Sequence, residues 1–122
     1  MMRRMTSAFV ALVLCGLALA AQTPDYAAMG RQVVQHMSSG QFAAVEKQLN
    51  AKMAAALPAP TLQSVWIHVE KRFGLFKDIT SATVRPVQGQ QLVLVACRFA
   101  NGPVTVQLAF DAQGKISGLY FR

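Results

Sequence analysis

Acidic side chains are scarce in this chain: its 122 residues contain five Asp and Glu against twelve Lys and Arg. A reaction that needs a carboxylate as general acid or base therefore has few candidates. Cysteine is scarcer still, with only Cys15 and Cys97, and Cys15 lies in an apolar N-terminal segment. If that segment is removed, no intrachain disulfide can form, so the remaining domain must be held by its apolar core.

Several functional motifs are also absent. There is no glycine-rich phosphate loop and no G-x-S-x-G element of the kind that carries a nucleophilic serine. No cysteine or acid lies at ligand spacing from either histidine, which argues against a metal site. After residue 21, only Lys71 and Arg72 adjoin among the basic residues, and no basic run is interleaved with aromatics, which argues against nucleic acid as a partner. We expect no cofactor.

Residues 1–21 have the layout of a secretory signal peptide. Arg3 and Arg4 form a basic start, an apolar run follows over 8–19, and small residues occur as A-x-A over 18–20. Cleavage is expected after Ala20 or Ala21. The apolar run is shorter than the roughly twenty residues that a membrane helix needs, so a retained anchor is the less favoured alternative. We therefore expect export to the periplasm or to the extracellular medium. The exported part is expected to be a single domain over 22–122.

Two other N-terminal signals are disfavoured by the residues themselves. The arginine pair could start a twin-arginine signal, but the residues after it, MTS, lack the apolar continuation. Cys15 could be the acylated residue of a lipoprotein. The residue before such a cysteine is small, however, and here it is Leu14, which is not. Ordinary export is the interpretation that remains.

Without Arg3 and Arg4, ten basic side chains face five acidic ones, a formal charge of +5 for residues 22–122. Such a charge favours weak attraction to anionic surfaces of the cell envelope. Cys97 lies in the apolar run LVLVACRF, and we expect a small buried side chain there rather than a reactive thiol or an intermolecular bridge.

Three helices are predicted in the first part of the domain. Apolar residues recur at three- and four-residue steps over 24–37, then over 41–57, then over 61–73. Gly40 and Gly74 are expected to end the first and third helices, and Pro58 to break the chain after the second. Thr61 is the expected N-cap of the third helix.

After Gly74 the apolar period shortens to two, which predicts strands over 77–87, 90–100, 104–110 and 115–121. The connections are short, and this favours an antiparallel meander. The fold class is thus α+β, with three N-terminal helices packed on a curved four-stranded antiparallel sheet.

The second predicted strand is apolar on both faces. Leu92, Leu94 and Ala96 share one face, and the other carries Val93, Val95, Cys97 and Phe99. The helices can cover only one side of the sheet, so the second side needs a partner or must curve over itself. Because a large exposed apolar patch is unfavourable, we expect a homodimer that packs sheet to sheet.

The order of motifs along the domain resembles a known family. It has GQF at 40–42, Leu57-Pro58 followed by Leu62 and Trp66, GLF at 74–76, and a closing FDAQGKISGLYF at 110–121. This pattern is similar to that of domain of unknown function 3887, which is grouped with the nuclear transport factor 2-like, or cystatin-like cone, folds. The closing motif is the most specific part of the likeness.

The resemblance implies a cone-shaped domain that occurs alone behind a signal peptide or ahead of a serine-hydrolase domain. It supplies no catalytic residues to carry over. The closing motif also leads us to expect that the last strand completes the domain at Arg122. We therefore expect a non-catalytic exported domain that acts by association and binds a protein partner or a small apolar ligand.

An alternative is a small lyase- or isomerase-type enzyme that uses an apolar pocket of the cone. The candidate bases are Glu70 beside the third helix's apolar stripe, Asp78 at the entry to the first strand, and His68. His68 lies more than 90° from that stripe, which predicts a solvent-facing side chain. The candidate lining of a ligand pocket is aromatic: Trp66, Phe76, Phe99 and Phe110, for which core packing is the simpler role.

Overall fold

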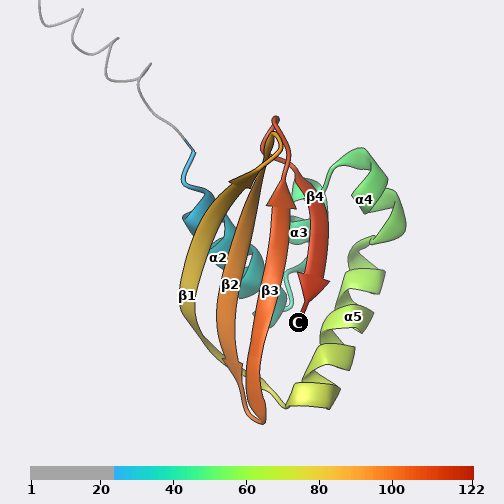
Figure 1. Cartoon of the computed structure of the whole chain (residues 1–122). Coiled ribbons are helices and arrows are strands. Elements are labelled where there is room, and N and C mark those ends of the chain that lie inside the picture. Colours follow the sequence, from blue (N-terminus) through green and yellow to red (C-terminus); the bar gives the residue numbers. More distant parts are fainter. Residues whose placement is uncertain (1–23) are drawn as a thin grey trace, which may run out of the picture.

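The computed structural model describes residues 24–122, so the predicted signal peptide and Cys15 lie outside the described residues. The helices in this range are α2 (Tyr26–Ser38), α3 (Phe42–Gln48), α4 (Ala51–Ala56) and α5 (Ala59–Phe73). The strands are β1 (Phe76–Val87), β2 (Gln90–Phe99), β3 (Gly102–Phe110) and β4 (Ile116–Phe121). The helices precede the strands along the chain, which confirms the predicted α+β class (Figure 1).

The prediction of three helices was wrong, because the expected helix over 41–57 is two helices, α3 and α4. Between them Leu49 is extended, with ψ 146°, and forms an isolated parallel bridge with Ile116 of β4. The Asn50 amide donates to the Ile116 carbonyl at 2.9 Å. The helix breaks because this segment supplies a backbone hydrogen-bond partner to the outer edge of β4.

The start of α5 also differs from the expectation. Thr61 is not its N-cap; Pro58 is, with an extended backbone, and Pro60 lies in the first turn. The free amide of Ala59 is satisfied by the Glu46 carboxylate of α3 at 2.8 Å. A side chain from another helix therefore caps this one, a role that local sequence signals do not reveal.

The sheet is an antiparallel meander in the order β1-β2-β3-β4, as predicted. Register shifts interrupt the β1–β2 pairing next to Asp78 and next to Ile79, which adds twist at that end of the edge strand. Gly40 and Gly74, the predicted helix ends, have φ of +78° and +87°, in the region that favours glycine.

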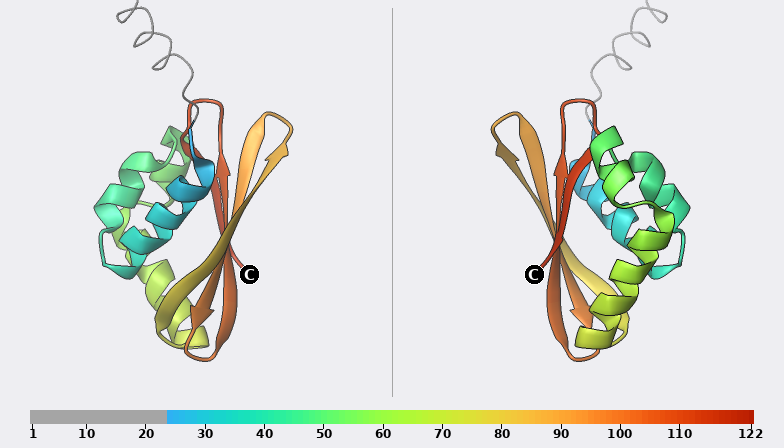
Figure 2. Two further views of the ribbon diagram at one scale, coloured as in Figure 1. Left: turned by 90° about the vertical axis from the view of Figure 1, so that its left-hand side faces the viewer. Right: turned by 90° about the vertical axis from the view of Figure 1, so that its right-hand side faces the viewer.

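The four helices of residues 24–122 lie on one side of the twisted sheet, and no element in this range covers its other side (Figure 2). The core lies between these layers. From the sheet it receives the alternating side chains of β2 and β3 and the first residue of β4: Val93, Val95, Cys97, Phe99, Val104, Val106, Leu108, Phe110 and Ile116. From the helices it receives chiefly Val33, Val34, Met37, Val45, Leu62, Trp66 and Val69. Burial of these side chains supplies the main stabilisation of a domain without disulfides.

Helix α2 approaches the sheet closely at Gly30. A Cβ atom placed on Gly30 would lie 2.6 Å from Val93 Cγ1 and 3.2 Å from Val95 Cγ2. The helix can therefore pack at this distance only with glycine in that position. None of the helices in residues 24–122 has the length and apolar character to cross a membrane.

Candidate functional site

A cleft of about 320 Å³ lies between α2 and the start of β1. Arg31 and Gln35, one helical turn apart, line it from the helix, and Phe76, Asp78 and Ile79 line it from the strand. The cleft combines polar and apolar side chains, and three of its five residues are exposed. Sequence reasoning selected Phe76 and Asp78 but missed Arg31 and Gln35, because they lie on the polar side of an amphipathic helix.

A second hollow of about 280 Å³ runs along one flank of α5, and its exposed lining is almost wholly apolar. Thr61, Ser64, Val65, His68 and Val69 form it. Helical geometry explains the grouping, since positions three and four apart share a flank. His68 is exposed, as its angular position predicted, yet it also borders this apolar groove.

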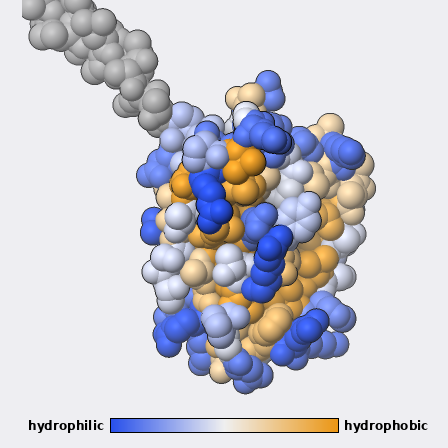
Figure 3. Space-filling view, in the orientation of Figure 1, coloured by the Kyte–Doolittle hydropathy of each residue, from blue (hydrophilic) through white to orange (hydrophobic). Residues whose placement is uncertain are grey.

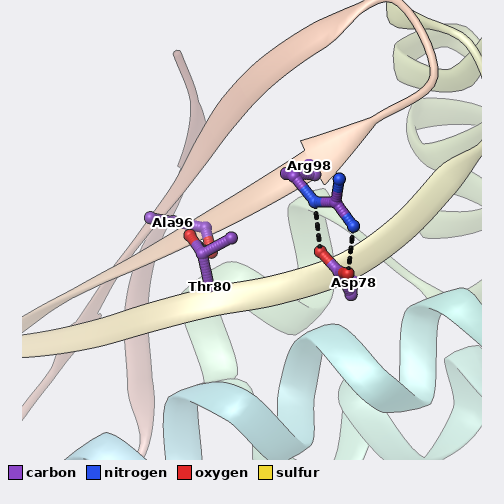
Figure 4. Close-up of polar contacts among 4 residues, drawn as sticks. All are labelled: Asp78, Thr80, Ala96 and Arg98. Atoms are coloured by element: carbon purple, nitrogen blue, oxygen red, sulfur yellow. Dashed lines mark hydrogen bonds and ion pairs between the residues drawn. The ribbon is translucent and has the colours of Figure 1, made fainter.

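Asp78 is held by Arg98 of the neighbouring strand (Figure 4). The Arg98 Nε donates to Asp78 Oδ1 at 2.9 Å, and its Nη2 donates to Oδ2 in a two-pronged ion pair. These hydrogen bonds, and then the Arg98 charge, lower the pKa of Asp78 below its ordinary value of 3.8. A carboxylate stabilised in its ionised form is a weaker base, which disfavours proton abstraction by Asp78.

Glu70 has a structural partner as well. Its Oε2 accepts a hydrogen bond from the Phe76 backbone amide at 3.2 Å, across the turn that joins α5 to β1. The carboxylate thereby fixes the path of the chain out of the helix. Glu70 lines neither the α2–β1 cleft nor the α5 groove.

The other three carboxylates are engaged in the same way. Asp25 caps α2 by accepting from the Ala28 amide at 3.1 Å, and Glu46 caps α5. Asp111 accepts from the amides of Gln113 and Lys115, both at 2.9 Å, in the turn before β4. All five acidic side chains of the chain therefore have an internal partner.

The basic side chains are in the opposite situation. Of the ten Lys and Arg residues in the described range, Arg98 is the one with an acidic partner within 4 Å. Lys115 instead donates to the Lys47 carbonyl, and the Arg72 guanidinium lies 5.5 Å from the centre of the Phe73 ring. The surface over residues 24–122 thus presents cationic groups that a partner could neutralise.

Three of the four aromatic residues expected to line a ligand pocket form one cluster. The Trp66 ring centre lies 5.8 Å from that of Phe76 and 5.6 Å from that of Phe99, and Phe76 and Phe99 are 5.5 Å apart. Phe110 is elsewhere in the core, 5.6 Å from Tyr26. Of these four, only Phe76 borders the α2–β1 cleft; a ligand pocket among them stays a prediction.

Cys97 is a free, buried thiol of β2. Burial, and to a lesser degree the negative charge of Asp78, raises the pKa of Cys97 to about 11. At neutral pH this side chain is a protonated thiol packed in the core, which agrees with the role of a small buried hydrophobe. Within the described residues, no group of three or more His, Cys, Asp and Glu side chains could hold a metal ion.

The side of the sheet that faces away from the helices, hereafter the open face, carries the second apolar side of β2. Residues paired in register share a face, so Leu92, Leu94 and Ala96 lie together there with their β3 partners. Each of these three is only half-buried, and Tyr120 of β4 on the same face is 56 % exposed. Figure 3 shows this face: apolar residues gather over the middle of the sheet, with strongly hydrophilic side chains across and around them.

Together these features define a small α+β domain with one covered and one open sheet face, whose carboxylates all serve the fold. Residues 30–119 match the family Protein of unknown function (DUF3887), and the chain belongs to this family, as the sequence motifs indicated. Esterase EstD of Thermotoga maritima is 21% identical over 89 residues, which cover 73% of this chain and 22% of the esterase. The chain thus spans about a fifth of that relative's length. No solved structure gave a match.

Proposed function

We propose that this protein is an exported, non-catalytic binding domain that acts by association, as a homodimer formed through the open face. It would belong to the cystatin-like cone folds and bind a protein partner or a small apolar ligand. The observation that carries the proposal is β2, which is apolar on both sides although the helices cover only one.

The energetic argument concerns the open face. Half-buried leucines beside an exposed tyrosine leave apolar surface in contact with water, at a cost of roughly 25 cal/mol per Å² that association would recover. A second copy is always available to cover such a surface, and a two-fold pair satisfies both copies at once. Homodimerisation is therefore the simplest association that fits.

The internal use of every carboxylate supports the non-catalytic part of the proposal. Glu70 accepts a hydrogen bond from a backbone amide, and Asp78 accepts from the guanidinium of Arg98. The many cations without acidic partners also favour a partner or an envelope surface that brings negative charge.

The purified protein at micromolar concentration, examined by sedimentation equilibrium, tests the association. We expect twice the mass of the single chain. Leu94→Glu, which places a charge in the middle of the open face, should give a monomer with an unchanged circular dichroism spectrum. Wild-type protein that remains monomeric over the whole concentration range would contradict the proposal.

Export is tested separately. Protein recovered from the envelope fraction of the producing cells should have a mass that lacks residues 1–20 or 1–21. A retained N-terminal methionine on membrane-bound protein would indicate an anchor instead.

A lyase- or isomerase-type activity is the second candidate, because His68 borders an apolar groove. Histidine is the side chain that most often serves as general acid or base in enzymes. Native mass spectrometry of the purified protein tests whether a small molecule is bound there. A ligand that is lost in His68→Ala and retained in the matched α5 surface variant Gln63→Ala would favour this candidate, whereas its equal retention in both would count against it.

A further inference from the structure

The backbone of β4 is paired with β3 on one side, and its other side is an edge of the sheet. Arg122 and Thr105 exchange two hydrogen bonds, of 2.8 and 2.9 Å, so the peptide groups of Arg122 point toward β3. In an antiparallel ladder such residues alternate with residues whose N–H and C=O point away. The register is regular from Phe121 back to Gly118. The N–H and C=O groups of Leu119 and Phe121 therefore point to the edge.

Only the first part of this edge is occupied by the chain itself. Leu49 forms its parallel bridge with Ile116, and the Asn50 amide bonds the Ile116 carbonyl at 2.9 Å. Beyond that point, no backbone group in residues 24–122 outside the ladder bonds Leu119 or Phe121. These two residues are about 7 Å apart along the strand. They offer two donors and two acceptors to a further strand.

Helix α5 lies behind β4 and reaches past its edge, as the front and side views agree (Figure 1 and Figure 2). The two elements meet in the core, where the ring centres of Trp66 and Phe121 are 6.3 Å apart. Because the sheet ends at β4, no strand of residues 24–122 lies over the part of α5 beyond the edge. Figure 3 shows apolar surface in this region, past the sheet and over α5.

The α5 groove, with a volume of about 280 Å³, is on this uncovered flank. Val69 at its inner side is also part of the core, and half-buried Val65 continues the groove outward to His68. Ala59, which Glu46 of α3 caps, lies about two and a half turns before His68 and so on the opposite side of the helix. The groove therefore faces away from α3, toward the space beside β4.

Positive charge borders the same region. Arg122 ends β4, and Arg72 lies one turn after His68 on α5; neither has an acidic partner within 4 Å. No acidic side chain lines the groove, and all five carboxylates of the chain are engaged within it. A second copy would bring the same cations and no spare carboxylate. Charge complementarity therefore favours a different, acidic partner.

We propose that an extended, acidic segment of another protein adds to β4 as a fifth strand and places its apolar side chains in the α5 groove. The inference rests on the association part of the proposed function and names the chemistry of the protein partner, but it does not depend on the homodimer. Backbone hydrogen bonds to Leu119 and Phe121 would supply affinity, and the groove would supply selectivity.

The register specifies the side chains of that segment. Residues opposite Leu119 and Phe121 share their face, which is the face toward the helices, and are therefore apolar. Residues opposite Tyr120 and Arg122 lie on the open face, and an acidic side chain there forms a cross-strand ion pair with Arg122. The segment thus alternates apolar with acidic residues.

The other edge of the sheet is less suited to such pairing. Register shifts interrupt β1 next to Asp78 and next to Ile79, and Pro86 has no N–H to donate. Shifts and prolines of this kind protect an edge strand from added strands. Residues 118–121 of β4 contain neither feature.

Labelled synthetic peptides of about seven residues, in which Glu alternates with Val, Ile or Leu, test the inference by fluorescence anisotropy. We expect binding with a Kd below about 1 mM. Lys in place of Glu should weaken binding about tenfold or more, and added salt should weaken the acidic peptides. N-methylation of the peptide amides that face β4 should also weaken binding about tenfold, because it blocks strand pairing and keeps the side chains. Binding of no acidic peptide, or equal binding after N-methylation, would overturn the inference.

Two pairs of protein variants locate the bound peptide. Val65→Gln in the groove should weaken binding about tenfold, whereas Ile67→Gln, at an exposed apolar position of α5 outside the groove, should not. Arg122→Glu should weaken it similarly, whereas Arg85→Glu on β1 should not. Equal effects within either pair would contradict the proposed position. Circular dichroism checks the fold; if Val65→Gln does not fold, the arginine pair and the N-methylated peptides decide.

Leu94→Glu separates this inference from the homodimer. It should bind the acidic peptide as tightly as wild type, because Leu94 lies on β2, away from the edge. Wild-type protein that is monomeric and binds the peptide would refute the homodimer and support the fifth strand. A dimer that the peptide displaces and that Leu94→Glu leaves intact would instead place a second copy at the β4 edge, and would overturn the acidic partner.

Discussion

Gly30 of α2 lies directly against Val93 of β2, so closely that a Cβ atom on the glycine would come within 2.6 Å of Val93 Cγ1. Val93 is fully buried and belongs to a strand that is paired on both sides, so it has little freedom to retreat. The contact sets how closely the first helix packs against the middle of the sheet.

Gly30→Ala is therefore expected to destabilise the domain by about 1–3 kcal/mol, the usual cost of overpacking a filled core. Urea denaturation measures it. In a Val93→Ala background, which removes the opposing methyl groups, the same change should cost little, because alanine is the better helix former by about 1 kcal/mol. Equal costs in both backgrounds would show that the close approach is not the cause.

Asn50 has two roles at the break between α3 and α4. Its backbone amide bonds the Ile116 carbonyl, and its side chain caps α4 by accepting from the Met53 amide at 2.8 Å. Asn50→Ala should cost about 1 kcal/mol through loss of the cap. Asn50→Asp keeps an acceptor at the positive end of the helix and should cost much less. The prediction fails if thermal unfolding ranks the aspartate variant with the alanine variant.

The Asp78–Arg98 ion pair makes a small contribution to folding stability that depends on pH in the acid range. Because the folded-state pKa of Asp78 is lowered, its contribution is present above pH 3.8 and is lost as the pH falls through the folded-state value. Both side chains are about half exposed, so the effect should be modest and weaker in high salt.

A comparison of wild type with Asp78→Asn by denaturation between pH 2 and 6 isolates this term, since those limits bracket the usual range of carboxylate titration by roughly two units. The two stability curves should converge at the acid end and separate toward neutral pH. Parallel curves would mean that Asp78 titrates alike in the folded and unfolded states.

The Cys97 thiol should be unreactive in the folded protein. With its pKa raised to about 11, little thiolate forms at neutral pH, and the sulfur is buried. Alkylation at pH 8 should be slow in native conditions and fast in denaturant. Fast native labelling would instead mark it as a reactive thiol.

The same shift has a consequence at alkaline pH. A raised folded-state pKa means that the stability is complete below the ordinary value of 9.0 and declines as the pH rises toward about 11. Cys97→Ala should lose this alkaline decline while paying a fixed packing cost at all pH values. An unchanged alkaline decline in Cys97→Ala would assign it to other groups.

Local sequence patterns determined the class of the fold and the core face of β3. Alternation along that strand placed Val106 and Leu108 on the buried side, and short connections made the sheet antiparallel. These features were predictable because side-chain periodicity and turn chemistry are properties of neighbouring residues. The family likeness rested on the same local motifs, and the match over residues 30–119 confirmed it. Strand β2 is apolar on both faces, so only the structure decided that its Val93 side faces the helices.

Only the tertiary structure decided the features that depend on residues far apart in the chain. The helix predicted over 41–57 breaks because the Asn50 backbone amide donates a hydrogen bond to the Ile116 carbonyl at the edge of β4. The carboxylates of Glu46 and Glu70 accept hydrogen bonds from backbone amides because packing brings those amides close to them. Gly30 must be glycine because Val93 lies opposite. In each case a contact across the fold outweighs a local preference of a few tenths to about one kcal/mol, which no local pattern can reveal.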